Sequence, residues 1–184
     1  MTVFAALLRA VNVGGTGTLK MADLKALCEG IGFDDVQTLL QSGNVAFTAT
    51  GTDKAVAKTL ADAIDKAHGF RPAIAVRTDA EIADAMKRNP FKAETKKDPR
   101  FVVVGFPADA PTAGAAARIA AVKGAASERL SLSGRELFVH YPEGQGRSKV
   151  TNAVLERALG VPVTVRNWNT VTKLMAMMEA GGRP

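Results

Sequence analysis

Apolar side chains recur along the chain at two different periods, and the points where the period changes predict the order of the elements. Strands place alternate side chains on one face, whereas an amphipathic helix returns to the same face every three or four residues. In residues 1–77 this pattern predicts strands at 3–9, 36–40, 45–48 and 73–77 and helices at 21–31 and around 56–64. The resulting order, β-α-β-β-α-β, is that of a ferredoxin-like unit.

The same order recurs in the second half of the chain. The pattern there predicts strands at 101–106, 130–132, 136–141 and 163–166 and helices at 111–123 and 149–159. The two hairpins match at one constant offset, which pairs Leu39, Ser42, Gly43 and Phe47 with Leu130, Ser133, Gly134 and Phe138. We therefore expect an α+β protein with two ferredoxin-like βαββαβ halves, antiparallel sheets and an internal repeat.

Each half is followed by a further helical pattern. Thr78 and Asn167 stand at the exits of the last strands and are of the residue types that cap helices, and Glu81 lies at capping-box spacing from Thr78. Between the halves, residues 89–99 contain two prolines and a run of charges, which is typical of a surface linker. The sequence thus predicts domains at 1–88 and 100–184, joined by the linker 89–99.

The composition narrows the class of protein. The 184 residues are 47% hydrophobic, which is enough to bury a core without disulfides. One cysteine cannot form an intramolecular disulfide, and one cysteine with two distant histidines does not make a structural zinc site. No apolar run reaches membrane-spanning length, and the N-terminal segment lacks the features of a signal peptide. We expect a cytoplasmic protein with no membrane contact, no metal and no cofactor.

Several catalytic motifs are absent from the sequence. It contains no P-loop, no dinucleotide fingerprint and no nucleophile elbow. Cys28 falls on the apolar face of a helical pattern, so we expect it to be a buried small hydrophobic residue. His68 at a helix end and His140 on a strand are each expected to be structural. No catalytic residue is predicted, and whether the chain is an enzyme stays open.

The topology predicts a first cluster of polar residues in the first half. In a βαββαβ unit the loop after the first strand and the tip of the hairpin lie at the same end. This end gathers Asn12, Gly14, Gly15, Gln41, Ser42 and Asn44. A glycine-rich backbone with short amides can hold an anion or a polar ligand. The alternative is that these residues serve tight turns.

A second cluster is predicted at the opposite end of the second half. It gathers Arg147, Ser148, Lys149, Arg166, Asn167, Trp168 and Asn169. Ser148 is the candidate N-cap of a helix that starts at Lys149, and two helix N-termini near basic side chains favour a phosphate or a carboxylate. Trp168 could stack on a ligand. The alternative is that Trp168 belongs to the core, Ser148 only caps, and the basic groups are solvated.

The net charge of +6 is unevenly distributed. Residues 85–100 carry six basic and two acidic side chains, and residues 141–184 carry six and three. Such basic segments attract anions, including nucleotides and nucleic acid. A solvated basic surface is the alternative interpretation.

Several segments, taken in order, resemble the bacterial family called domain of unknown function 1697. They are Leu7-Leu-Arg-Ala-Val-Asn-Val-Gly-Gly15, Leu40-Gln-Ser-Gly-Asn-Val-Ala-Phe47, Asn89-Pro-Phe91, Gly146-Arg-Ser-Lys149 and Thr164-Val-Arg-Asn-Trp-Asn-Thr-Val-Thr-Lys-Leu174. The resemblance implies tandem ferredoxin-like halves in a cytoplasmic protein, without an established activity.

These observations leave three functional hypotheses. The first is a binding protein, or an enzyme of unknown class, that takes a small anionic or nucleotide-like ligand at the second cluster. The second is an RNA- or DNA-binding protein, although strand 135–141 lacks the aromatic pattern of an RNA-recognition motif. The third is a structural or oligomerisation module that uses the run 174–178, which contains three methionines. The oligomeric state is not predicted.

Overall fold

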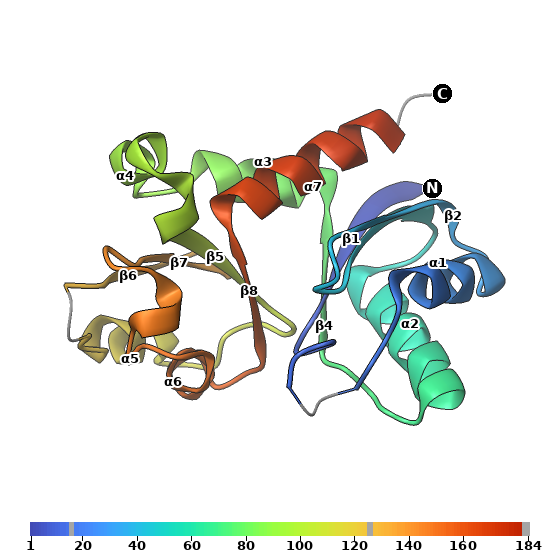
Figure 1. Cartoon of the computed structure of the whole chain (residues 1–184), viewed down its shortest axis with the longest axis horizontal. Coiled ribbons are helices and arrows are strands. Elements are labelled where there is room, and N and C mark those ends of the chain that lie inside the picture. The colour runs from blue at the N-terminus through green and yellow to red at the C-terminus, as the bar shows by residue number, and fades with distance from the viewer. Residues whose placement is uncertain (15–16, 125–126, 182–184) are drawn as a thin grey trace. The chain divides into compact units, whose positions relative to one another are not determined.

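The structure, a computed structural model, describes residues 1–14, 17–124 and 127–181. Residue contacts divide the chain into two compact units, residues 84–172 and residues 1–83 together with the C-terminal segment from residue 173. Each unit contains one four-stranded antiparallel sheet (Figure 1). The predicted α+β class with two ferredoxin-like halves is confirmed.

The first sheet has the strand order β2-β3-β1-β4. Its elements are β1 (Thr2–Leu8), α1 (Met21–Gly30), β2 (Asp34–Leu39), β3 (Asn44–Ala49), α2 (Asp53–His68) and β4 (Ile74–Thr78), followed by α3 (Asp79–Lys87). Helices α1 and α2 cover one face of the sheet, where Leu24 and Leu60 of the helices share a core with Phe4, Phe47 and other alternate strand residues. That alternation is what the period of two along the strands predicted.

The second sheet has the equivalent order β6-β7-β5-β8. Its elements are α4 (Lys92–Lys97), a 3-10 helix (Pro99–Phe101), β5 (Val102–Pro107), α5 (Ala115–Ala121), β6 (Arg129–Ser133), β7 (Glu136–His140), a 3-10 helix (Gln145–Arg147), α6 (Asn152–Leu159) and β8 (Val163–Asn167), followed by α7 (Trp168–Gly181). Helices α5 and α6 cover one face, and α4 lies on the other (Figure 1).

The two halves repeat each other down to single residues. Arg77 of β4 lies opposite Ala5 of β1, and Arg166 of β8 lies opposite Val104 of β5. Each guanidinium donates from Nη1 to the carbonyl oxygen of the residue before it, at 2.8 Å for Arg77 and 2.9 Å for Arg166. The internal repeat predicted from the matched hairpins is therefore present in the sheets.

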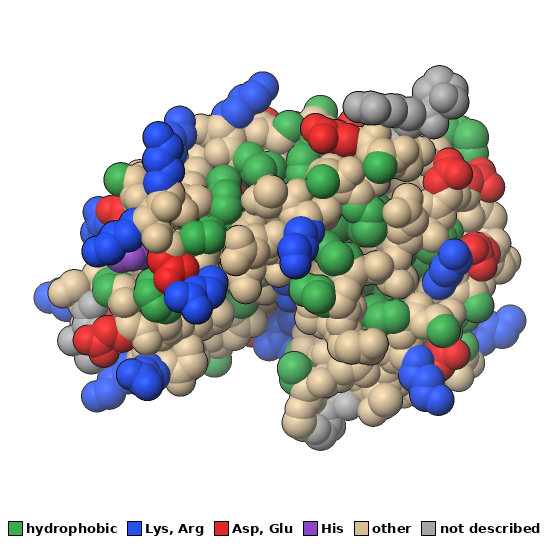
Figure 2. All heavy atoms as spheres, turned by 45° about the horizontal axis from the view of Figure 1, so that its top comes forward, with side chains coloured by type: hydrophobic (Ala, Val, Ile, Leu, Met, Phe, Trp, Pro, Cys, Tyr) green, Lys and Arg blue, Asp and Glu red, His purple; other side chains and the backbone are tan. Residues whose placement is uncertain are grey.

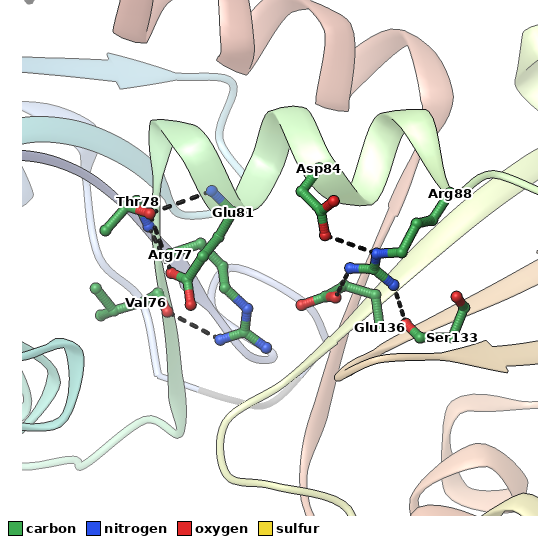
Figure 3. A network of polar contacts seen from close by, with 8 residues as sticks. All are labelled: Val76, Arg77, Thr78, Glu81, Asp84, Arg88, Ser133 and Glu136. Atoms are coloured by element: carbon green, nitrogen blue, oxygen red, sulfur yellow. Dashed lines mark hydrogen bonds and ion pairs between the residues drawn. The ribbon is translucent and has the colours of Figure 1, made fainter.

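The helix caps predicted at Thr78 and Asn167 are present. Thr78 and Glu81 form a capping box, in which the Glu81 amide donates to the Thr78 hydroxyl at 3.2 Å and the Thr78 amide donates to the Glu81 carboxylate at 2.9 Å (Figure 3). Asn167 caps α7 by accepting the amide of Thr170 at 2.9 Å. Local side-chain chemistry thus sets where α3 and α7 begin.

Arg88, directly after α3, ties that helix to the β6–β7 hairpin. Its guanidinium donates to Asp84 at 2.7 Å and to the buried Glu136 at 2.6 Å, and it also bonds the carbonyl oxygen of Ser133 (Figure 3). A carboxylate buried without a cation would be costly, so Arg88 fixes the position of the hairpin. The hairpin in turn sets the register of β6 against β7, which brings Arg129 opposite His140.

Three sequence expectations differ from the structure. The helix expected at 111–123 begins at Ala115, because Gly114 before it has φ +78°. The helix expected from residue 149 begins at Asn152. The segment 89–99, interpreted as a linker, contains α4 because Phe91 is buried and anchors the first turn. The domain boundaries at residues 88 and 100 stay a prediction.

We expect Gly43→Ala to lower the free energy of unfolding by roughly 2–3 kcal/mol. Gly43 has φ +76°, and an added Cβ would lie 2.4 Å from Val11 and 2.9 Å from the Cβ of Leu8. Gly30→Ala is the matched control, since nothing lies within 4 Å of its added Cβ at the last residue of α1, and it should change the free energy of unfolding by no more than about 0.5 kcal/mol. Urea unfolding measures the stability of both variants, and equal unfolding midpoints for Gly43→Ala and Gly30→Ala would contradict the expectation.

Candidate functional site

The predicted cap at Ser148 is wrong. Residues 145–147 form a 3-10 helix, and α6 begins only at Asn152. The Ser148 hydroxyl instead accepts the amide of Val150 at 3.0 Å and contacts the carboxylate of Glu128. A hydroxyl engaged in these two contacts does not reach the first turn of α6.

The chain remains extended between Ser148 and α6 because Val150 is buried in the core beneath the helices. The hydroxyl of Tyr141 donates to the carbonyl oxygen of Val150 at 2.9 Å and fixes this stretch. Lys149 is therefore outside the helix, contrary to the sequence expectation, and both Arg147 and Lys149 are exposed on the loop.

Arg166 projects from the face of the second sheet that is opposite α5 and α6. Val163 and Val165, at alternate positions of β8, pack in the core with those helices. Arg166 follows Val165 directly, so its side chain points to the other face. Burial lowers the pKa of the Arg166 guanidinium to about 10. Strands β7 and β8 both end beside the start of β5, so the chain that leads to the loop 147–149 leaves the sheet at the end where Arg166 lies. Val150, next to that loop, packs on the helix-covered face.

Asn167 ends β8, and Trp168 and Asn169 begin α7. Asn167 is exposed and uses its side-chain oxygen as the cap, while Trp168 is half-buried and Asn169 is exposed. The ligand-binding role of residues 147–149 and 166–169 stays a prediction.

In the first-half cluster, the side-chain amides of Asn12 and Asn44 bond backbone groups of turns. The Asn12 side chain donates to the carbonyl oxygens of Leu19 at 2.7 Å and Gln41 at 2.8 Å, and its own oxygen accepts the Leu19 amide at 2.8 Å. Asn44 is buried and donates to Leu39 and to the hydroxyl of Ser42.

Among the other members of this cluster, Gly14 and Gln41 are exposed and Gly15 lies outside the described residues. The side-chain bonds of Asn12 and Asn44 are consistent with the turn alternative. A ligand at this cluster stays a prediction.

A pocket of about 490 Å³ lies in the second unit, between α4 and the sheet. We call it the α4 pocket, and its lining residues are Ala93, Glu94, Lys97, Asp98, Phe101, Arg129, His140 and Pro142. Its volume is in the range of small-molecule binding sites. The pocket lies on the same sheet face as Arg166, because Arg129 and His140 alternate with the residues that pack against α5 and α6.

Asn89 and Phe91 hold the first turn of α4 in place. The buried side chain of Asn89 accepts the Phe91 amide and donates to the hydroxyl of Thr95, both at 2.9 Å. Thr95 donates in turn to the carbonyl oxygen of Phe91 at 2.7 Å. A helix this short needs such anchors, because propensity alone does not stabilise six residues in water.

Arg129 joins the sheet to α4. Its guanidinium lies 5.1 Å from the ring centre of Phe91 and forms an ion pair with Glu94. The hydrogen bond from Arg129 is the main cause of the lowered pKa of the Glu94 carboxyl. Glu94 is therefore ionised at neutral pH, and the pair forms one wall of the pocket.

His140 lies opposite Arg129 on β7 and is neutral at pH 7. Burial is the main cause that lowers its pKa, and the positive charges of Arg129 and Lys97 lower it further while Glu94 opposes them. Among the described residues, its Nδ1 is buried and has no hydrogen-bond partner. An N–H buried there without an acceptor would be costly, so the proton belongs on Nε2 and Nδ1 carries a lone pair.

The remaining charges of the pocket are largely paired. Asp98 accepts Arg100 at 2.7 Å, and hydrogen bonds from Arg100 lower the pKa of the Asp98 carboxyl to about 2. Arg100 also lies 5.7 Å from the ring centre of Phe101. Within the described part of the chain, Lys97 makes no ion pair and supplies the unbalanced positive charge.

Other chemistry-bearing groups do not form a site. Burial is the main cause that raises the pKa of the Cys28 thiol to about 12, so Cys28 is inert, as its apolar setting indicated. No three His, Cys, Asp or Glu side chains come together as metal ligands within residues 1–14, 17–124 and 127–181. In the same residues, the helices are all too short or too polar to cross a bilayer.

Comparison with known proteins gives the family. A family model described as protein of unknown function (DUF1697) matches residues 1–138. The chain belongs to this family. The match includes the segment Asn89-Pro-Phe91, which positions α4, and it ends before the segments 146–149 and 164–174.

A solved structure supports the fold of this DUF1697 member. It is a conserved bacterial protein from Streptococcus pneumoniae, with 20% sequence identity and a TM-score of 0.75. The likeness covers 96% of this chain and 98% of that one, and at this identity it shows the fold alone. None of the curated proteins matches the chain.

Sequence reasoning missed the α4 pocket, although one signal pointed to part of it. The predicted hairpin around Ser133 and Gly134 already implies that Arg129 lies opposite His140. Two ionisable side chains at one end of a hairpin face indicate a polar site. The helix that covers them, α4, was not predicted, because the prolines and charges of residues 89–99 are typical of a linker.

We expect acidification to destabilise the protein through His140. Its pKa is below the ordinary value of 6.5 in the native state, so the unfolded chain binds the proton at higher pH. The contribution of neutral His140 to the free energy of unfolding is therefore complete above pH 6.5, and it is lost as the pH falls toward the native pKa. Urea unfolding between pH 7.5 and 5 should show a steeper loss for the wild type than for His140→Gln.

The pKa itself can be followed by NMR titration, with the two histidines assigned through a His68→Gln variant. Lys97→Gln should raise the pKa of His140, because it removes a positive neighbour. Lys54→Gln, in α2 of the other unit, is the control. A pKa of His140 at or above 6.5 in the wild type would contradict the neutral, buried state.

Proposed function

We propose that the second unit binds a small nucleotide-like ligand, with a flat ring and an anionic group, in the α4 pocket. The observation that carries this proposal is the combination of one unpaired cation, one neutral histidine donor and one aromatic wall in a pocket of about 490 Å³. Ligand sites combine apolar walls with a few fixed polar groups in this way.

The polar groups favour an anion beside a hydrogen-bond acceptor. Lys97 contributes the charge, since Arg129 and Arg100 are already paired with Glu94 and Asp98. His140 contributes an Nε2–H, because its buried Nδ1 leaves Nε2 as the nitrogen that a ligand can reach. Charge-assisted hydrogen bonds from such donors each contribute about 1.5–3 kcal/mol.

The apolar groups favour a flat ring. Phe101 and Pro142 line the pocket, and the guanidinium of Arg100 lies over the Phe101 ring at 5.7 Å. A planar ligand ring can stack on Phe101 in offset or edge-to-face geometry, as aromatic pairs in proteins do. Sugar phosphates lack such a ring, so they should bind more weakly than nucleotides.

The loop 147–149 is the competing location for an anion. Arg147 and Lys149 are exposed there, and Ser148 is already bonded to Glu128. Exposed lysine and arginine side chains hold an anion weakly, because water and salt screen the charge. The self-association hypothesis has less support, since Leu174 and Met178 of the run 174–178 are buried within the chain.

Thermal unfolding with adenosine 5′-monophosphate tests the proposed function. At about 100 times the dissociation constant, the ligand should stabilise the native state by about 2.7 kcal/mol and raise the melting temperature by several degrees. Lys97→Gln and Phe101→Leu should each reduce the rise. The double variant Arg147→Gln, Lys149→Gln is the control for the location of the site, and it should show the same rise in melting temperature as the wild type.

The NMR signals of the His140 imidazole ring give a second measurement of nucleotide binding. They should shift on addition of the nucleotide, whereas those of His68 should not. No rise in melting temperature with adenosine 5′-monophosphate, sugar phosphates or sulfate would refute ligand binding. A rise abolished by the Arg147 and Lys149 changes would move the site to the loop predicted from sequence.

A further inference from the structure

We infer that the α4 pocket takes one nucleotide of a single-stranded nucleic acid, and that α4 contacts the phosphates of its neighbours. This inference rests on the proposed function and names the partner. It starts from the cations outside the pocket, which a free mononucleotide would leave unused.

The cations of α4 divide between two faces of the helix. Lys97 shares the pocket face with Ala93 and Glu94. Lys92 and Lys96 are four residues apart, so they lie on one face about 6 Å apart along the axis. Both are exposed and neither lines the pocket. The basic character of α4 therefore continues beyond the volume that a small ligand fills.

Arg100 and Arg129 complete what we call the α4 basic patch, Lys92, Lys96, Lys97, Arg100 and Arg129. Two acidic side chains lie among these cations, Glu94 and Asp98, and both are held in ion pairs. The patch thus keeps a surplus of three positive charges, of which Lys97 lines the pocket and Lys92 and Lys96 lie on another face of the same short helix. Figure 2 shows lysine and arginine side chains gathered over the part of the second unit that carries α4.

An aromatic side chain next to a basic surface is how proteins hold single strands without reading a sequence. Bases stack on aromatic side chains while basic groups follow the phosphates. Here Phe101 supplies the stacking surface, and the Nε2–H of His140 supplies a donor to a base or sugar oxygen. Duplex would not place a base in the pocket, because its bases are stacked inside the helix.

An acidic peptide is the other macromolecule that a basic patch attracts. The pocket favours nucleic acid over such a peptide, because carboxylate side chains would leave Phe101 and Pro142 without a flat partner. The two partners also differ in how binding responds to Phe101→Leu. That change keeps the apolar volume and removes the ring.

Fluorescence anisotropy with a labelled six-nucleotide adenosine RNA tests this inference, beside adenosine 5′-monophosphate and a hexaglutamate peptide. The hexamer should bind at least about tenfold more tightly than the mononucleotide at low salt. Lys92→Gln with Lys96→Gln should weaken binding of the hexamer and leave binding of the mononucleotide unchanged. For the hexamer, the slope of the logarithm of the binding constant against the logarithm of the salt concentration should become shallower by about 1.4. Phe101→Leu should weaken both nucleotides roughly tenfold.

The matched control is Lys54→Gln with Lys66→Gln, which removes the same charge from exposed positions of α2 and should change nothing. If the mononucleotide binds and the hexamer binds no more tightly, the inference fails and the proposed function stands. If hexaglutamate binds as tightly as the hexamer, the partner is acidic protein and the inference fails. If neither nucleotide binds, both proposals fail.

Discussion

The flat guanidinium of Arg129 is the group on which the α4 pocket depends. It lies against the ring of Phe91, pairs with Glu94 and stands opposite His140, so one side chain joins the start of α4, its first turn and two strands. The pair with Glu94 is partly exposed and adds little stability. Its importance is orientation, because only a planar cation can stack on a ring and present donors at its edge. A lysine there would keep the charge and lose the geometry.

The same two-layer unit is used differently in the two halves. Each sheet has two helices on one face and an arginine at the equivalent position of its last strand. In the first half, the amides of Asn12 and Asn44 bond backbone carbonyls and close turns. In the second half, a short helix before the first strand covers part of the other face and leaves a polar pocket beneath it. The two halves therefore share one scaffold, and the short helix α4 distinguishes the second half from the first.

Much of the fold could be predicted from local pattern, and the errors come from distant partners. The strands, the hairpins and the caps at Thr78 and Asn167 depend on neighbours in sequence, and all are present. The cap at Ser148 failed because Glu128, twenty residues earlier, contacts its hydroxyl. The linker interpretation failed to show α4 because burial of Asn89 and Phe91 depends on the sheet, which no local pattern reveals. The histidine of the pocket was visible in the hairpin register, but its lowered pKa required the covering helix.

The division of the chain into units has a consequence for its synthesis. The last turns of α7 group with residues 1–83, while all of residues 84–172 lie between them in sequence. A ribosome adds about 5–20 residues per second, so the first unit waits roughly 4–18 s for its final segment after its own sheet has emerged. During that interval its four strands can already pair, because the sheet is complete by Thr78. The second unit is then made while the first unit still lacks its C-terminal segment.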